Sequence, residues 1–235
     1  VNLVRFDLGL LNKFLGDNFG IAGLATGNAI IYSPWESNAG LMMRLVSDST
    51  EVAGRRMGTF RIASSLGNGK MHVIARNDID GKRTMNITGD YLLKNHRIDA
   101  TADLDRFDAG YIAPVMESVF SEMGGSISGR VKASGTLDSL SLSSEGTRFD
   151  DVLLRVGFTN VPYYVSGPFS VTDQGLFFDE VTIKDRFDGT GTIAGGLLYD
   201  HLKNFRMDTR IKMRGIEAID MTESDNQTFY GHLFA

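Results

Sequence analysis

Alternation of apolar and polar residues is the dominant pattern along this chain of 235 residues. In the segment 205–213 one face carries Phe205, Met207, Thr209, Ile211 and Met213, and Arg206, Asp208, Arg210 and Lys212 alternate with them. Similar alternation occurs at 127–133, 152–158 and 163–171. A period of two predicts strands with one buried face and one face in water.

The turn residues predict how these strands are connected. Asn68-Gly69, Asp80-Gly81 and Asp188-Gly189 favour two-residue hairpins, because Asn, Asp and Gly tolerate positive φ angles. Gln174-Gly175 is a weaker signal of the same kind. We therefore expect an antiparallel meander of roughly fourteen to sixteen short strands.

One segment departs from the alternation. Apolar residues between Phe107 and Met123 recur at helical spacing, with Pro114 acceptable in a first turn and Gly124-Gly125 at the end. We expect a helix over about 114–123 that caps the sheet, and Leu8 to Phe14 as its equivalent earlier in the chain. Its short polar face is acidic and lacks the Lys and Arg of membrane-surface helices. A cap packed on the sheet is favoured over an element that lies on a membrane or binds a partner.

So few helices cannot cover the apolar faces of so many strands. The sheet must therefore fold over itself, as a sandwich, a barrel or a long bent trough. The predicted class is mainly β, with repeated antiparallel strands and one or two short capping helices.

The chain also repeats itself. Ile21-Ala22-Gly23 returns as Ile127-Ser128-Gly129, and Ile87-Thr88-Gly89 returns as Ile193-Ala194-Gly195, both at an offset of 106 residues. Phe229-Tyr230-Gly231 begins a third copy. Stacked repeats share one continuous core. The predicted organisation is one sheet containing a first β repeat over 1–105, a second over 106–214 and the start of a third over 215–235.

Composition and charge narrow the function. The net charge is −5 with no basic block, so nucleic acid is not an expected partner. The chain has no cysteine, which rules out disulfides and thiolate sites. No apolar run is long enough to span a membrane, and the N-terminus lacks a signal-peptide pattern. We interpret the chain as a piece of a longer protein, with any anchor outside it.

No constellation of catalytic or metal-binding residues stands out. The four histidines show no metal-ligand spacing, and no hydrolase signature occurs. The glycines of 189–195 suggest a phosphate loop only loosely, and strand glycines are the preferred interpretation. The acid pairs Asp78 with Asp80 and Asp103 with Asp105 could bind Ca²⁺, but a solvated strand face is favoured. We expect no enzyme activity, no metal and no cofactor.

Several motifs occur in an order that resembles a known family. The motifs are Gly175–Phe178, Val181–Asp185, Gly189–Gly195, His201–Asn204 and Asp225–Gly231. The chain resembles the C-terminal periplasmic part of TamB-like translocation and assembly module proteins, within the AsmA-like group. This resemblance covers essentially the whole chain, and its motifs are structural.

The resemblance implies a fold, a location and partners. The sheet would curl into an elongated open groove, the β-taco, which shields phospholipid acyl chains in the periplasm of a Gram-negative bacterium. The parent protein would be anchored in the inner membrane and would engage an outer-membrane barrel of the TamA/BamA kind. Its function would be to support outer-membrane lipid transport and biogenesis, without catalytic residues.

The candidate groove-lining residues are apolar positions of the alternating segments. They are Val152, Leu154, Val156, Phe158, Tyr163, Val165, Phe169, Val171, Ile211 and Met213. Two alternatives remain open: an assembly factor that offers strand edges to outer-membrane β-barrel proteins, and an all-β surface or adhesive protein with a closed, filled interior.

Overall fold

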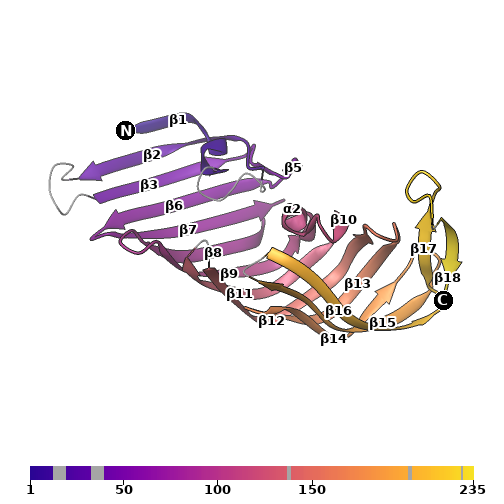
Figure 1. Ribbon diagram of the computed structural model, residues 1–235. Helices are drawn as coiled ribbons and strands as arrows, with labels where there is room; N and C mark the ends of the chain where they lie inside the picture. Colours follow the sequence, from indigo (N-terminus) through magenta and orange to yellow (C-terminus); the bar gives the residue numbers. More distant parts are fainter. Residues whose placement is uncertain (13–19, 33–39, 137–138, 201–202, 229) are drawn as a thin grey trace. The chain divides into compact units, whose positions relative to one another are not determined.

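The computed structural model describes residues 1–12, 20–32, 40–136, 139–200, 203–228 and 230–235, and strands dominate this part of the chain (Figure 1). The strands are β1 Asn2–Asp7, β2 Leu24–Tyr32, β3 Gly40–Ser47, β4 Glu51–Val52, β5 Arg55–Arg56, β6 Thr59–Gly67, β7 Lys70–Ile79, β8 Lys82–Leu92, β9 Arg97–Asp108, β10 Phe120–Met123, β11 Ser126–Thr136, β12 Ser139–Val156, β13 Pro162–Thr172, β14 Gly175–Lys184, β15 Thr190–Asp200, β16 Lys203–Arg214, β17 Glu217–Met221 and β18 Gly231–Phe234. The helical turns are η1 Leu8–Leu11, η3 Ala109–Ile112 and α2 Ala113–Met116.

Fourteen of these strands form one sheet. Its order is β1-β2-β3-β6-β7-β8-β9-β11-β12-β13-β14-β15-β16, and β10 pairs with β12 beside this path. Two small sheets, β4-β5 and β17-β18, complete the described strands. Neighbours in the large sheet mostly follow chain order, so the predicted all-β class and antiparallel meander are confirmed.

Two compact units make up the chain. The first unit comprises residues 1–107 and 130–143, and the second comprises 108–129 and 144–235. The expected boundary between the first two repeats, at 105/106, lies close to the end of the segment 1–107. Residues 130–143 belong to the first unit, although the repeat assigns them to the second copy.

The predicted hairpin turns have different outcomes. Asn68-Gly69 and Asp80-Gly81 are two-residue turns, and Asn68 and Asp80 both have positive φ. Thr172 pairs with Gly175, so the turn there is Asp173-Gln174, one residue earlier than predicted.

The hairpin predicted at Asp188-Gly189 is wrong. Lys184 pairs with Thr190, so the connection between β14 and β15 is the longer loop 185–189. Asp185 organises this loop by accepting the backbone N–H groups of Phe187 and Gly189, each at 2.8 Å. A side chain thus replaces the two-residue turn.

The predicted helix over 114–123 is only partly correct. Pro114 lies in the first turn of α2, as expected, but α2 ends at Met116. Phe120–Met123 forms strand β10, whose register with β12 shifts between Phe120 and Glu122. The shift lets Phe120 and Met123 both be buried, so a strand with a bulge reproduces the three-residue spacing of a helix.

The element expected at Leu8 to Phe14 begins as the 3-10 turn η1, and Phe14 lies outside the described residues. Leu8 donates its backbone N–H to the Gly23 carbonyl at 2.9 Å, and Ala109 does the same to Gly125 at 3.0 Å. Asp7 and Asp108 cap the two turns through their side chains. The two copies are thus similar locally, at an offset of 101 residues between Leu8 and Ala109 rather than 106.

Candidate functional site: apolar sheet faces and an ionic cluster

Strand pairing places apolar residues together on one face of the first unit. Val73 lies opposite Ser64 and Gly89, and the neighbouring rows contain Met71 and Ala75. Residues on this face in the same three rows are Gly27, Ala29, Ile31, Leu41, Met43, Leu45, Ile62, Leu66, Ile87, Tyr91, Ile98, Ala100 and Ala102. Apolar and small residues therefore form a continuous surface across six strands, in which Ser64 is the only aliphatic hydroxyl.

The opposite face of the same strands carries their charged residues, with apolar residues such as Met42, Val46 and Ile74 among them. Arg44, Arg61, Arg76, Asp90 and Asp103 all occupy alternate positions that point away from the apolar face. Asp103 forms an ion pair with Arg130 at 2.6 Å, and Asp78 pairs with Arg61 and Arg83. The acid pairs considered as Ca²⁺ sites thus contain aspartates that already contact guanidinium groups.

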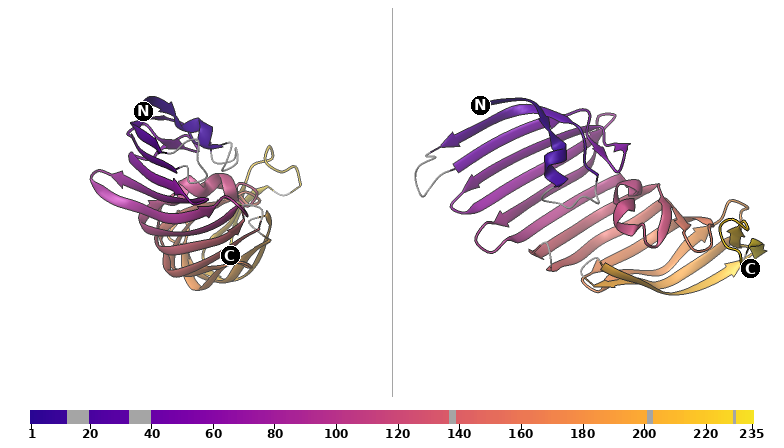
Figure 2. Two further views of the ribbon diagram at one scale, coloured as in Figure 1. Left: turned by 90° about the vertical axis from the view of Figure 1, so that its left-hand side faces the viewer. Right: turned by 45° about the horizontal axis from the view of Figure 1, so that its top comes forward.

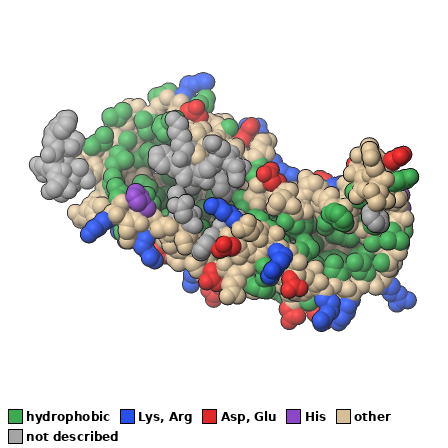
Figure 3. Space-filling view, viewed as in Figure 1, with side chains coloured by type: hydrophobic (Ala, Val, Ile, Leu, Met, Phe, Trp, Pro, Cys, Tyr) green, Lys and Arg blue, Asp and Glu red, His purple; other side chains and the backbone are tan. Residues whose placement is uncertain are grey.

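Only part of the apolar face of the first unit is covered by the described residues. Leu8 packs against Ala25 and Leu45, with Leu3 and Phe6 beside them. Farther along the sheet Met71, Val73 and Ile87 are only half-buried, and Ile31 is 59% exposed. Figure 3 shows hydrophobic side chains gathered on the surface over β2, β3 and β6. The unit thus has an extended apolar surface that the described residues leave half-buried.

The second unit buries its apolar face more completely. Val152 lies opposite Val165, which lies opposite Ile183, and all three are buried. The rings of Phe149 and Phe169 stack with their centroids 4.1 Å apart. The second unit therefore has a packed core along β12, β13 and β14. Figure 2 shows these strands from two further sides.

The predicted lining residues fall into three groups. Val152, Val165 and Phe169 are buried, Leu154, Val156, Tyr163 and Val171 are half-buried, and Phe158, Ile211 and Met213 are exposed. Pairing of Val152 with Val165 and of Leu154 with Tyr163 places these four on one face, and Phe169 and Val171 follow on β13. Ile211 and Met213 lie on β16, opposite Ile193 and Gly191, and are exposed.

The face expected over 152–158 ends at Val156, the last residue of β12, which pairs with Phe120. Phe158 is in the following turn and is 77% exposed, so it lies outside the strand face. The lining prediction also omitted the apolar face of the first unit, although alternation over 60–66 and 71–77 indicates it.

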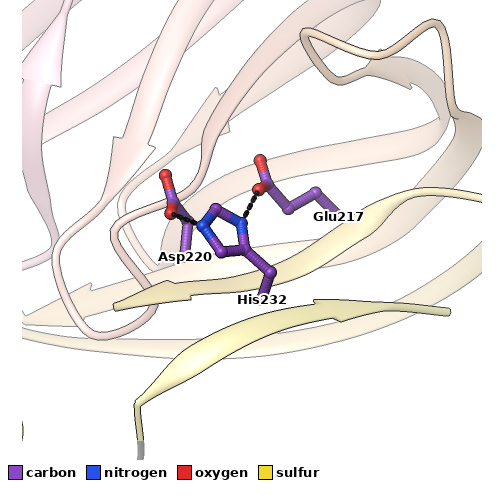
Figure 4. A group of neighbouring side chains, drawn as sticks. All are labelled: Glu217, Asp220 and His232. Carbon is purple, nitrogen blue, oxygen red and sulfur yellow. Dashed lines mark hydrogen bonds and ion pairs between the residues drawn. The ribbon is translucent and has the colours of Figure 1, made fainter. Parts of the chain in front are cut away.

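An ionic cluster forms where the β17-β18 hairpin meets the 185–189 loop (Figure 4). His232 on β18 faces two carboxylates of β17: its Nδ1 is 3.1 Å from Glu217 Oε1, and its Nε2 is 3.2 Å from Asp220 Oδ1. The Arg186 guanidinium contacts the same two carboxylates, at 2.9 Å and 2.6 Å. The carboxylate of Glu217, which is fully buried, is therefore paired with the positive charge of Arg186.

Asp185 attaches this cluster to the sheet. Its Oδ2 accepts the Glu217 backbone N–H at 2.6 Å, in addition to the two loop N–H groups. Burial alone would raise the pKa of Asp185, but the three backbone donors and Arg186 outweigh it and leave that pKa below its usual value. Tyr163 donates its hydroxyl to the Glu217 carbonyl at 2.9 Å, and burial raises the pKa of this phenol, with Glu217 and Asp185 adding to the rise.

The cluster is the one group among the described residues that could hold a metal ion. The ligand atoms of Glu217, Asp220 and His232 all lie within 4.8 Å of one another. Arg186 already supplies a positive charge there, so the arrangement acts as a clamp between the loop and the hairpin. Sequence reasoning missed it because two strands bring together residues 217, 220 and 232, which match no linear metal motif.

The glycines of 189–195 lie mainly within β15, as the strand interpretation predicted. Gly195 has a φ of 118° and faces the backbone of Asp208 and Thr209, where a side chain would not fit. In the described part of the chain no helix is long and apolar enough to cross a membrane.

Comparison with known proteins adds no relative. No family model, no curated protein and no solved structure matches the chain.

Proposed function

We propose that this chain is a non-enzymatic scaffold whose apolar sheet face shields the acyl chains of phospholipids. The observation that carries this proposal is the half-exposed apolar face of the first unit, which is continuous over β2, β3 and β6 to β9. Apolar surface left in water costs about 25 cal/mol per Å². An extended apolar patch of this kind is typical of an interaction surface.

Acyl chains suit this face better than a protein partner does. Its rows offer half-buried aliphatic side chains such as Met71, Val73 and Ile87, with few groups that could fix the orientation of a polar partner. Protein interfaces are usually enriched in aromatic and arginine anchors. A flexible hydrocarbon chain needs only a dry surface, and a sheet curled into a β-taco groove would supply it along its length.

From the resemblance in motif order we infer that this scaffold works in the periplasm of a Gram-negative bacterium, as part of a TamB-like, AsmA-like protein anchored in the inner membrane. In that setting it would support outer-membrane lipid transport and biogenesis and would engage a barrel of the TamA/BamA kind. The half-exposed apolar face argues against the surface or adhesive alternative, which requires a filled interior.

The first test is native mass spectrometry with lipid extraction on the chain purified from a Gram-negative host. We expect phospholipid at a defined stoichiometry. Ile87→Asp should abolish lipid copurification while the protein stays folded. The matched control is Thr88→Asp, the adjacent residue on β8, which points to the polar face and should keep its lipid. A wild-type protein that is soluble and free of lipid would contradict the proposal.

A second candidate is an assembly factor that binds client strands at a sheet edge. β16 ends the strand order and runs over twelve residues, so one of its edges has no strand partner among the described residues. Arg206, Arg210 and Lys212 occur along it, and charged residues on an edge strand disfavour augmentation. Photo-crosslinkers placed along β16 should capture client barrel strands if this candidate is correct.

A further inference from the structure

A shallow hollow of about 360 Å³ lies on the polar face of the first unit. Four arginines line it, Arg44, Arg61, Arg76 and Arg83, and Asp78 is the only acidic residue that does. The hollow therefore has a formal charge of +3, whereas the whole chain has a net charge of −5. This local excess of positive charge lies on the side of the sheet opposite to the proposed lipid face.

The arginines are arranged in a way that favours an anion between them. Arg61 and Arg76 are direct cross-strand partners, and like charges in that position repel each other. Asp78 contacts both Arg61 and Arg83, and among the described residues Arg76 has only the neutral Asn86 amide oxygen, at 3.1 Å. Arg44 has no partner among the described residues. In the described part of the chain, the guanidinium groups of Arg44 and Arg76 therefore contact no carboxylate.

The floor of the hollow is apolar. Val46, Ala63 and Ile74 lie among the arginines, on the face where the other strand positions are mostly polar. An apolar floor reduces the number of water molecules that compete for the guanidinium donors. It also accommodates the carbon atoms that would accompany an anionic group.

We propose that this hollow binds a phosphate-bearing ligand, with Arg44 and Arg76 as its main donors. Phosphate oxygens accept the parallel N–H pairs of guanidinium groups, and one phosphate has enough oxygens for two arginines. The ligand relieves the repulsion between Arg61 and Arg76 and neutralises part of the +3 charge. This site is independent of the proposed lipid function, since the two lie on opposite faces of the sheet.

Isothermal titration calorimetry on the full chain, with inorganic phosphate at constant ionic strength, tests the proposal. We expect saturable binding to one site. The double variant Arg44→Gln/Arg76→Gln should weaken phosphate binding about tenfold or more. Arg44→Lys alone should weaken binding less than Arg44→Gln does, because lysine keeps the positive charge but lacks the parallel N–H donors of the guanidinium group. Arg97→Gln, on the same sheet but outside the hollow, is the matched control.

Absence of saturable binding at millimolar phosphate would overturn the proposal, as would equal weakening in the Arg97→Gln control. Circular dichroism must show that the double variant is folded. Because Ile87→Asp should leave phosphate binding unchanged, failure of the lipid function and failure of this site are distinguishable.

Two further titrations identify the source of the phosphate. If glycerol phosphate binds but vesicles of phosphatidylglycerol do not, the ligand is soluble. If the vesicles bind the wild type and not the double variant, it is a lipid headgroup. Vesicle binding that persists in the double variant would count against the hollow as the headgroup site.

Discussion

The two units carry the same alternation of apolar and polar residues, yet they differ in how much of the apolar face is covered. In the second unit Val152, Val165 and Ile183 follow one another across three strands and are all buried. In the first unit the corresponding middle rows contain Val73 and Ile87, which are half-buried. Similar patterns thus bury a row of three aliphatic side chains in the second unit and leave Val73 and Ile87 half-buried in the first.

This difference indicates where a hydrophobic ligand would bind. A residue that the fold already buries has no accessible surface that a ligand could cover. When a ligand covers a half-buried apolar residue, the removal of its remaining surface from water stabilises the complex. The apolar face of the first unit is therefore the better candidate for lipid contact. Of the predicted lining residues, Val152, Val165 and Phe169 are buried and belong to the fold, whereas Leu154, Tyr163 and Val171 are half-buried, as Val73 and Ile87 are.

The largest effect is expected from Val152→Asp. An unpaired carboxylate at a fully buried position of the second unit should lower the free energy of unfolding by about 4 to 5 kcal/mol. Urea denaturation followed by circular dichroism measures this loss. Thr182→Asp, at an exposed position of β14, should stay within about 0.5 kcal/mol of the wild type. Equal stability of the two variants would show that the core is not packed as described.

Asp185 should give the second unit a marked sensitivity to acid. Its folded-state pKa is lowered below the ordinary value of 3.8, so its contribution is complete above that value and is lost as the pH falls through the lower folded pKa. Asp185→Asn should cost about 2 kcal/mol at neutral pH, because an amide cannot accept all three backbone N–H groups. It should also flatten the acid limb of stability in denaturation curves measured from neutral pH to pH 3. An unchanged acid limb would contradict this role.

Ile87→Asp should have a smaller effect on stability than Val152→Asp. Because Ile87 is half-buried, the aspartate can reach water, and we expect a loss of about 1 to 2 kcal/mol. The same urea denaturation measures it, with Thr88→Asp as the matched control. A loss as large as that of Val152→Asp would mean that the face of the first unit is closed core.

The smallest effect should come from Asp90, on the polar face of the first unit. Hydrogen bonds from Lys70 and then His72, both at 2.7 Å, hold its pKa below the usual value. The contribution is again lost as the pH falls, but these groups are solvent-exposed and screened by salt. Asp90→Asn should therefore barely change the midpoint of denaturation, and added salt should remove the difference. A salt-resistant change would contradict this expectation.

Local signals in the sequence were reliable where a short segment decides its own structure. Asn68-Gly69 and Asp80-Gly81 form the predicted turns because these residues reach positive φ with little strain. Pro114 lies in a first turn because its missing N–H costs nothing there. Alternation identified the strands because a sheet with one dry face requires it.

Predictions from local sequence were wrong where contacts with distant residues outweigh the local conformational preference of a segment. Asp188-Gly189 did not become a tight hairpin, since Asp185 gains three backbone donors by holding a longer loop. Phe120–Met123 did not extend the helix, since pairing with β12 satisfies its backbone and a bulge still buries Phe120 and Met123. The contacts of His232 with Glu217 and Asp220 could likewise not be predicted from the sequence, because two different strands bring these residues together.

The sequence by itself determined the all-β class, the antiparallel meander and the presence of one dry face per strand, because these follow from period-two patterning and turn chemistry. Only the tertiary structure decided which dry residues are core and which remain accessible, which charges gather in the arginine hollow, and how the last hairpin is clamped. The reason is physical: burial and electrostatic pairing depend on which strands lie side by side, and the alternation of apolar and polar residues does not specify those neighbours.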